Sequence, residues 1–324
     1  MAFSDPRSVM KRSRNTWLFT FFVIGVLLVL TLVLTMRSGV AYSREQRVIG
    51  GVEVVVVLEQ APGTPELFSS LFDTFADNLT RYDSPEFFPA TAPRPDQVFP
   101  LDPVDREVFQ QLHLLSQRTE GLYDVSLGSL VELYQSNPSP SVEQLDAAFE
   151  RVGYAQLEWV DEGVRFSSGG QLFFRPMARA IAMDRAWQLV RELAPQQTGY
   201  IMVERDIVVF GPRNGRVPWM YSLEADSEPI FYLYGGALVK GPLWTLNPII
   251  GRYEASRFSR GFVLGPSATF SQAMLIAVSF LSRDQAQEFL DKRGIVAGLE
   301  YEGDVVYTGG ARELQLNDNK VFRK

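Results

Sequence analysis

The sequence contains no cysteine, which excludes a disulfide framework, thiolate catalysis and a thiolate metal site. This absence fits oxidising and reducing compartments equally, so it does not indicate where the protein resides. Histidine is almost as scarce, because His113 is the single one. Its place in a helical pattern favours a partly exposed surface histidine over a catalytic base. A nucleophile triad that requires histidine has no other candidate.

Common nucleotide-binding signatures are missing as well. There is no phosphate loop, and no Gly-x-Gly-x-x-Gly follows a predicted strand. Basic charge is also in the minority, since 31 Lys and Arg face 38 Asp and Glu and leave a net charge of −7. Binding to nucleic acid requires a basic surface that neutralises phosphates, so we expect no nucleic-acid partner.

One long stretch has no charged residue at all. Residues 15–36 contain no Asp, Glu, Lys or Arg, and as a helix they would extend about 33 Å, enough to cross a bilayer. A cleaved signal peptide is the alternative, with Gly39-Val40-Ala41 as its cleavage site. Because this apolar run exceeds the hydrophobic region of a signal peptide, we interpret residues 15–36 as a transmembrane anchor.

The charges around this anchor predict its orientation. Basic residues that stay on the cytoplasmic side precede it, namely Arg7, Lys11, Arg12 and Arg14. In a bacterium the protein would then be a single-pass inner-membrane protein with a cytoplasmic N-terminus and a periplasmic main domain. The predicted organisation is a cytoplasmic tail (1–14), the span (15–36), a linker (37–47) and one soluble domain (48–324).

Strand and helix patterns alternate irregularly in the rest of the chain. A β-branched run at Val52–Leu58 predicts a buried strand, and a helix with one apolar face follows. Ser141 begins a later helix, with Gln144 placed for a capping box. Further helices are expected at 103–119, 177–193, 269–281 and 283–292, and strands near 159, 164–166, 201–203, 207–210, 219–223 and 231–234. Helices inserted irregularly among strand pairs indicate an α+β fold.

Three segments carry a resemblance to a known family. Glu120–Gly128 and Leu130–Tyr134 resemble T-x-G-x-F-D-P-T-x-G-x-L-x-x-L-W of the FAD:protein FMN transferases, the ApbE family. Ala148–Tyr154 is similar to that family's helix ending in V-G-Y. The resemblance extends over about residues 48–300 and implies a single ApbE-like α+β domain. Enzymes of this family are typically exported and often tethered to a membrane.

The segments that hold the flavin dinucleotide in this family differ here. In D-L-G-G-I-A-K-G-Y-A-V-D, glycines let the backbone approach the phosphates and the lysine is a charge partner. Arg175-Pro176 replaces that glycine pair, and proline has no N–H to donate to a phosphate. The second glycine pair, in N-x-G-G-D, is Glu204-Arg205 before Asp206. The identical residues that remain in the first segment are Ala178, Ala182 and Asp184.

The metal and acid–base motifs have changed too. The family's A-D-A-L-A-T-A, whose Asp and Thr bind a divalent cation, has Gln272 and Ile276 at the ligand positions. An amide and an alkyl group do not make a magnesium site. The motif H-x-x-D-P-x-T-G corresponds to Trp244–Gly251, which lacks the histidine, the carboxylate and the threonine, and M-G-T corresponds to Ile49-Gly50-Gly51.

These losses predict a membrane-anchored pseudoenzyme without catalytic, cofactor-binding or metal-binding residues. It would be a structural or assembly subunit of a larger electron-transport or light-harvesting membrane complex, with the membrane and other subunits as partners. A divergent but active FMN transferase is one alternative, which would depend on Asp184, Asn247 and Gln272. A non-catalytic module that binds flavin or another small ligand is the other.

Overall fold

The computed structural model describes residues 40–84, 98–137, 139–167, 170–222, 230–242, 258–301 and 304–308. The chain divides into two compact units, Met1–Tyr42 and Ser43–Lys324. The cytoplasmic tail and the transmembrane anchor expected at 1–14 and 15–36 lie outside the described residues. Among the residues that are described, no helix is long and apolar enough to cross a membrane.

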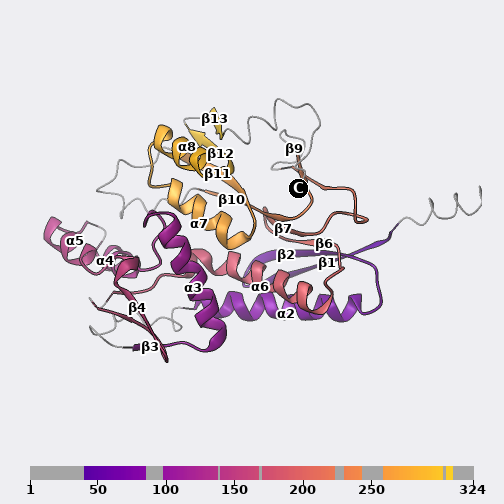
Figure 1. Cartoon of the computed structure of the whole chain (residues 1–324), viewed down its shortest axis with the longest axis horizontal. Helices are drawn as coiled ribbons and strands as arrows, with labels where there is room; N and C mark the ends of the chain where they lie inside the picture. Colours follow the sequence, from indigo (N-terminus) through magenta and orange to yellow (C-terminus); the bar gives the residue numbers. More distant parts are fainter. Residues whose placement is uncertain are drawn as a thin grey trace, which may run out of the picture. The chain divides into compact units, whose positions relative to one another are not determined.

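An eight-stranded sheet forms the centre of the second unit (Figure 1). The pairings from β2 to β13 are antiparallel. The strands follow the order β1 (Tyr42–Ile49), β2 (Val52–Glu59), β6 (Gly199–Val203), β7 (Asp206–Phe210), β10 (Gly236–Pro242), β11 (Phe258–Gly265), β12 (Val296–Tyr301) and β13 (Asp304–Tyr307).

Both faces of the sheet are covered where β7, β10 and β11 pass. Val208 and Phe210 of β7 belong to the main core, whereas Ile207 and Val209 belong to a second core on the opposite face. Helices α2 (Thr64–Asp83), α6 (Ala178–Leu193) and α7 (Ala268–Val278) pack on the main-core face. The hairpin of β8 (Trp219–Ser222) and β9 (Ile230–Leu233) covers the second core.

A smaller layer of helices and strands completes the unit. Helix α3 (Pro103–Arg118) lies near a three-stranded sheet, and α4 (Gly128–Ser136) packs on α5 (Val142–Phe149). The capping box expected at Ser141 and Gln144 is confirmed at the start of α5. The small sheet has the order β3 (Val98–Pro100), β5 (Gly163–Phe166) and β4 (Leu157–Val160), and α8 (Arg283–Lys292) precedes β12.

Several strands are not evident from the sequence pattern. Residues 42–47, which the sequence assigns to a linker, are part of the edge strand β1, whose charged side chains obscure its alternation. Strands β10 to β13 were also not predicted. By contrast, the strands expected at 52–58, 201–203 and 207–210 are confirmed. The expected α+β class is therefore confirmed, although five of the eight strands of the large sheet were missed.

The surface position expected for His113 is wrong. Its side chain is buried on the inner face of α3, with ring edges against Tyr154 and Trp159. Its Nε2 is hydrogen-bonded to the Gln117 amide at 2.7 Å. Burial lowers the pKa of the imidazole, which keeps it neutral as a packing residue.

Candidate functional site

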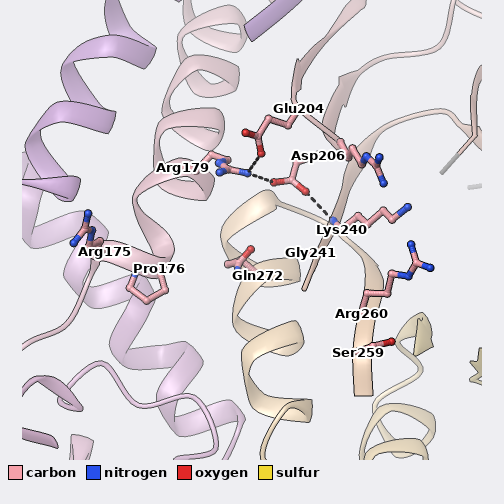
Figure 2. Close-up of a pocket in the computed structure, with 11 residues that line it drawn as sticks. Arg175, Pro176, Arg179, Glu204, Asp206, Lys240, Gly241, Ser259, Arg260 and Gln272 are labelled. Carbon is pink, nitrogen blue, oxygen red and sulfur yellow. Dashed lines mark hydrogen bonds and ion pairs between the residues drawn. The ribbon is translucent and has the colours of Figure 1, made fainter. Parts of the chain in front are cut away.

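A charged pocket of about 710 Å³ lies where β7, β10 and β11 meet the start of α6 and the middle of α7 (Figure 2). Its described lining has five cationic side chains and two carboxylates, which is unusual in a chain with a net charge of −7. The cations are Arg175, Arg179, Arg205, Lys240 and Arg260, and the carboxylates are Glu204 and Asp206.

Three of the altered family segments meet in this pocket. Arg175-Pro176, Glu204-Arg205-Asp206 and Gln272 all line it, although they are far apart in the sequence. Ile276, one helical turn after Gln272, is instead buried in the core. Trp244–Gly251 and Asn247 lie outside the described residues, and Ile49-Gly50-Gly51 forms the end of β1 and the turn to β2, away from the described lining.

An ion-pair network fills one side of the pocket. The Arg179 Nη1 atom, in the first turn of α6, is 2.8 Å from Glu204 Oε2 and 3.6 Å from Asp206 Oδ2. Asp206 Oδ1 also accepts a hydrogen bond of 2.7 Å from the backbone N–H of Lys240. Figure 2 shows both carboxylates turned toward Arg179. Burial dominates at Asp206 and raises its pKa to about 6.

Glu204 has an unusual backbone conformation for a residue with a side chain. Its φ is +54°, in the left-handed region that favours glycine. It stands in the two-residue turn between β6 and β7, where paired strands require positive φ. The left-handed backbone costs roughly 1–2 kcal/mol for a residue with a Cβ. The glycine backbone expected from the resemblance is thus retained, but it carries a carboxylate.

Arg175 and Pro176 lie in a short 3₁₀ turn that leads into α6. Pro176 offers no N–H, and the Arg175 side chain forms an exposed ion pair of 3.0 Å with Asp83. In the family this position is a bare glycine backbone that approaches phosphates. Both positions carry a side chain and Pro176 lacks a donor, so the residues present do not fit a flavin dinucleotide held in that manner.

The expected ligands of a divalent cation do not fit either. Gln272 contributes a neutral amide to the pocket, and Ile276 is an alkyl side chain in the core. Magnesium is bound by carboxylates and other oxygen ligands in octahedral geometry. Within the described parts of the chain, no group of three or more His, Asp or Glu side chains could hold a metal ion.

Asp184, which the resemblance preserves, does not line the pocket. Its two carboxylate oxygens accept hydrogen bonds of 2.8 Å from the backbone N–H groups of Ala268 and Thr269. These are the first residues of α7, whose N-terminus favours negative charge. Burial raises the pKa of Asp184 in spite of these donors. The residue therefore links α6 to α7, and its oxygens are already occupied.

Lys240 and Arg260 are pocket residues that the sequence pattern did not identify. Each lies on a strand that was not predicted, and only the pairing of β7, β10 and β11 brings them together. In the sequence, each of these two residues is marked only as a basic side chain within a mostly apolar segment.

Comparison with known proteins agrees with this architecture. Residues 51–237 match the model of the ApbE family. No curated protein matches the chain. Among solved structures, the ApbE protein of Thermotoga maritima is 19% identical, with a TM-score of 0.73 over 86% of this chain and 100% of that one.

Two further solved structures give similar values. The apo form of the flavinyl transferase ApbE of Pseudomonas stutzeri is 19% identical, with a TM-score of 0.73 over 85% of this chain and 97% of that one. The flavin transferase ApbE of Vibrio cholerae is 15% identical, with a TM-score of 0.67 over 85% of this chain and 99% of that one. At such identities the likeness concerns the fold.

Proposed function

The chain belongs to the ApbE family, and from that premise we propose that it is a pseudoenzyme that serves as a structural or assembly subunit of a larger membrane complex. One observation carries this proposal. The changed positions of three separate family segments converge on one pocket, and each change opposes a different part of flavin transfer. A chance error in comparing the segments would not bring these residues together in space.

The changes affect three requirements of the family's reaction, which are phosphate binding, metal binding and the close approach of the backbone to the ligand. Pro176 removes a donor, and Glu204 places a side chain where the family has a bare glycine backbone. Gln272 and Ile276 supply no carboxylate for a divalent cation. The family's reaction therefore has no support from the described lining.

The membrane role in this proposal is supported by the sequence. Residues 15–36 are long and apolar enough for an anchor, and the basic residues before them favour a periplasmic main domain in the inner membrane. Enzymes of the family serve electron-transport complexes, which favours an electron-transport or light-harvesting assembly as the partner. That last step is an analogy with the family.

A divergent active transferase is the weaker reading. It would depend on Asp184, Asn247 and Gln272, but both oxygens of Asp184 are hydrogen-bonded to the start of α7. A module that binds flavin without turnover would meet the same obstacles at Arg175-Pro176 and Glu204.

Calorimetry with FAD, with and without magnesium, tests the proposal on the full chain in detergent. We expect no measurable binding under either condition. The matched control is a variant in which Arg175→Gly, Pro176→Gly, Glu204→Gly, Gln272→Asp and Ile276→Thr restore the family residues, which should gain affinity. Micromolar FAD affinity of the unmodified chain that rises with magnesium would overturn the pseudoenzyme proposal.

The assembly role needs a separate measurement. The protein purified from native membranes in mild detergent should elute with other subunits. Elution of the native protein as a free species would contradict this role whatever the flavin result.

A further inference from the structure

Three loops lie together at the end of the large sheet where the chain enters the second unit. Ser43, near the start of β1, accepts a hydrogen bond of 2.9 Å from the side chain of Gln60, which follows β2. The backbone N–H of Glu59 donates to the carbonyl of Thr198, which precedes β6. The first residue of β6 pairs with the last residue of β7, and Figure 1 shows the start of α2 and the end of α6 at this same end. These entry loops are residues 60–63, 194–198 and 211–218.

The entry loops are close in the chain to the proposed membrane anchor. Seven residue steps separate Met36, where the charge-free run ends, from Ser43, and a chain of that length extends at most about 25 Å. With residues 15–36 as the anchor, Ser43 cannot lie further than this from the end of the span. The tether therefore keeps the entry loops within reach of the lipid headgroups.

The charge of the entry loops is opposite to that of the whole chain. They contain Arg213 and Arg216 but no Asp or Glu, whereas the chain has a net charge of −7. The opposite ends of β6 and β7 are joined by a turn that contains Glu204, and the exposed Glu66 and Glu192 belong to helices α2 and α6. An anionic bilayer surface attracts arginine, so the entry loops can approach it without repulsion from carboxylates of their own.

Two exposed apolar side chains flank the entry loops. Leu193 at the end of α6 is 62% exposed, and Val217 in the third loop is 51% exposed. A backbone hydrogen bond of 2.8 Å from the Val217 N–H to the Arg213 carbonyl holds this loop in a turn. Apolar side chains next to basic ones are typical of surfaces that lie in the lipid interface. A bilayer would thus cover the apolar atoms that water covers poorly.

We propose that the entry loops form a membrane-contacting surface, in which Leu193 and Val217 enter the lipid interface and Arg216 binds the phosphates of anionic lipids. This inference rests on the anchor in the proposed function and adds a second contact with the same bilayer. One contact would leave the domain free to rotate on its tether, whereas two contacts set its orientation. The charged pocket lies at the opposite end of β7, so this orientation turns the pocket away from the membrane and toward a partner.

The absence of cysteine makes single labels in the full chain a direct test. Leu193→Cys and Val217→Cys are each labelled with a nitrobenzoxadiazole fluorophore and reconstituted into vesicles of phosphatidylethanolamine and phosphatidylglycerol. Nitroxide lipids labelled near the headgroup should lower the fluorescence of both labels at least about twofold, because interfacial side chains lie at that depth.

The matched control labels are also on exposed apolar residues. Leu114→Cys on α3 and Val142→Cys on α5 replace side chains that are 50% and 67% exposed, and both helices lie away from the entry loops (Figure 1). Their fluorescence should not change with nitroxide lipids. Adding Arg216→Gln should reduce the quenching of the label at position 217, whereas Arg118→Gln, an exposed arginine on α3, should leave it unchanged.

Quenching of the entry labels that is no stronger than that of the controls would overturn the inference. Equal quenching with Arg216→Gln and Arg118→Gln would overturn the assigned role of Arg216. Extraction with alkaline carbonate separates this result from the proposed function. Release of the unmodified chain from the vesicles would refute the anchor itself, whereas a retained chain with unquenched entry labels would refute only the membrane-contacting surface.

Discussion

At Asp206, burial and favourable charged partners act on the pKa in opposite directions. The carboxylate is 5% exposed and lies between Arg179 and the backbone of Lys240, with Glu204 adding a like charge. Burial prevails over the favourable partners, and its pKa rises from 3.8 to about 6. The folded protein therefore holds a proton that the unfolded chain releases at lower pH.

The stability of the protein should depend on pH through this residue. Between pH 3.8 and about 6 the folded state binds more protons than the unfolded state, so the free energy of unfolding falls as pH rises. Asp206→Asn keeps an acceptor for the Lys240 N–H but does not titrate. Relative to this variant, the unmodified chain should lose up to about 3 kcal/mol across the window. Thermal unfolding followed by circular dichroism at several pH values measures the difference, and parallel profiles would show that Asp206 is not responsible.

Asp184 matches the family motif, and in this structure its role is to hold two helices together. Its carboxylate receives two N–H groups at the start of α7. Asp184→Ala should lower the free energy of unfolding by about 2–3 kcal/mol, because two buried donors lose their partner. The free energy of unfolding of Asp184→Asn should lie between those of Asp184→Ala and the unmodified chain, since its amide can accept at only one oxygen. The exposed Asp73→Ala is the control, and chemical denaturation gives the values; a loss no larger than that of the control would refute the role.

The turn between β6 and β7 carries a charged side chain on a backbone conformation that favours glycine. Glu204 has a φ of +54° and reaches Arg179 across the pocket. The ion pair is partly exposed, with 37% of the Arg179 side chain and 48% of the Glu204 side chain accessible. Such pairs contribute at most about 1 kcal/mol, which does not clearly exceed the backbone cost.

A pair of substitutions separates these two effects. Glu204→Gly and Glu204→Ala both remove the ion pair, but only alanine keeps a Cβ in the left-handed conformation. We expect the glycine variant to be more stable than the alanine variant by about 1 kcal/mol. Equal free energies of unfolding in urea would mean that the turn changes its conformation when the carboxylate is removed.

Helix α7 keeps its place in the fold although Gln272 and Ile276 stand at the positions expected for metal ligands. Ser267 caps its start, because the Ser267 hydroxyl accepts a hydrogen bond of 3.1 Å from the Phe270 N–H, and most side chains of the helix are buried. Ile276 fits that surrounding core, whereas a metal ligand at this position would need a polar neighbour. Core packing of α7 and a hard-cation site on it are therefore alternative uses of one helix face.

For the whole molecule, the orientation in the membrane is the main prediction. A periplasmic reporter such as alkaline phosphatase should be active when fused after Lys324 and inactive when fused before Ser13, because the basic residues of the N-terminal tail stay in the cytoplasm. Activity measured in intact cells gives the result. The opposite pattern would place the main domain in the cytoplasm and refute the proposed localisation.

The sequence by itself determined the local elements and the resemblance to a family. The β-branched run of β2 and the capping box of α5 are encoded by residues that are close together in the chain. The charge-free run at 15–36 and the absence of cysteine likewise need no tertiary contact to be recognised. Motif by motif, the sequence also located the changes at Arg175-Pro176, Glu204 and Gln272.

Only the tertiary structure decided where these residues meet. The burial of His113 depends on the packing of α3 against Tyr154 and Trp159. The charged lining of the pocket depends on the pairing of β7, β10 and β11, which brings Asp206, Lys240 and Arg260 together from distant parts of the chain. Strand register is fixed by the side chains that two distant segments bury together. No local pattern contains that information, and the pocket could not be assembled without it.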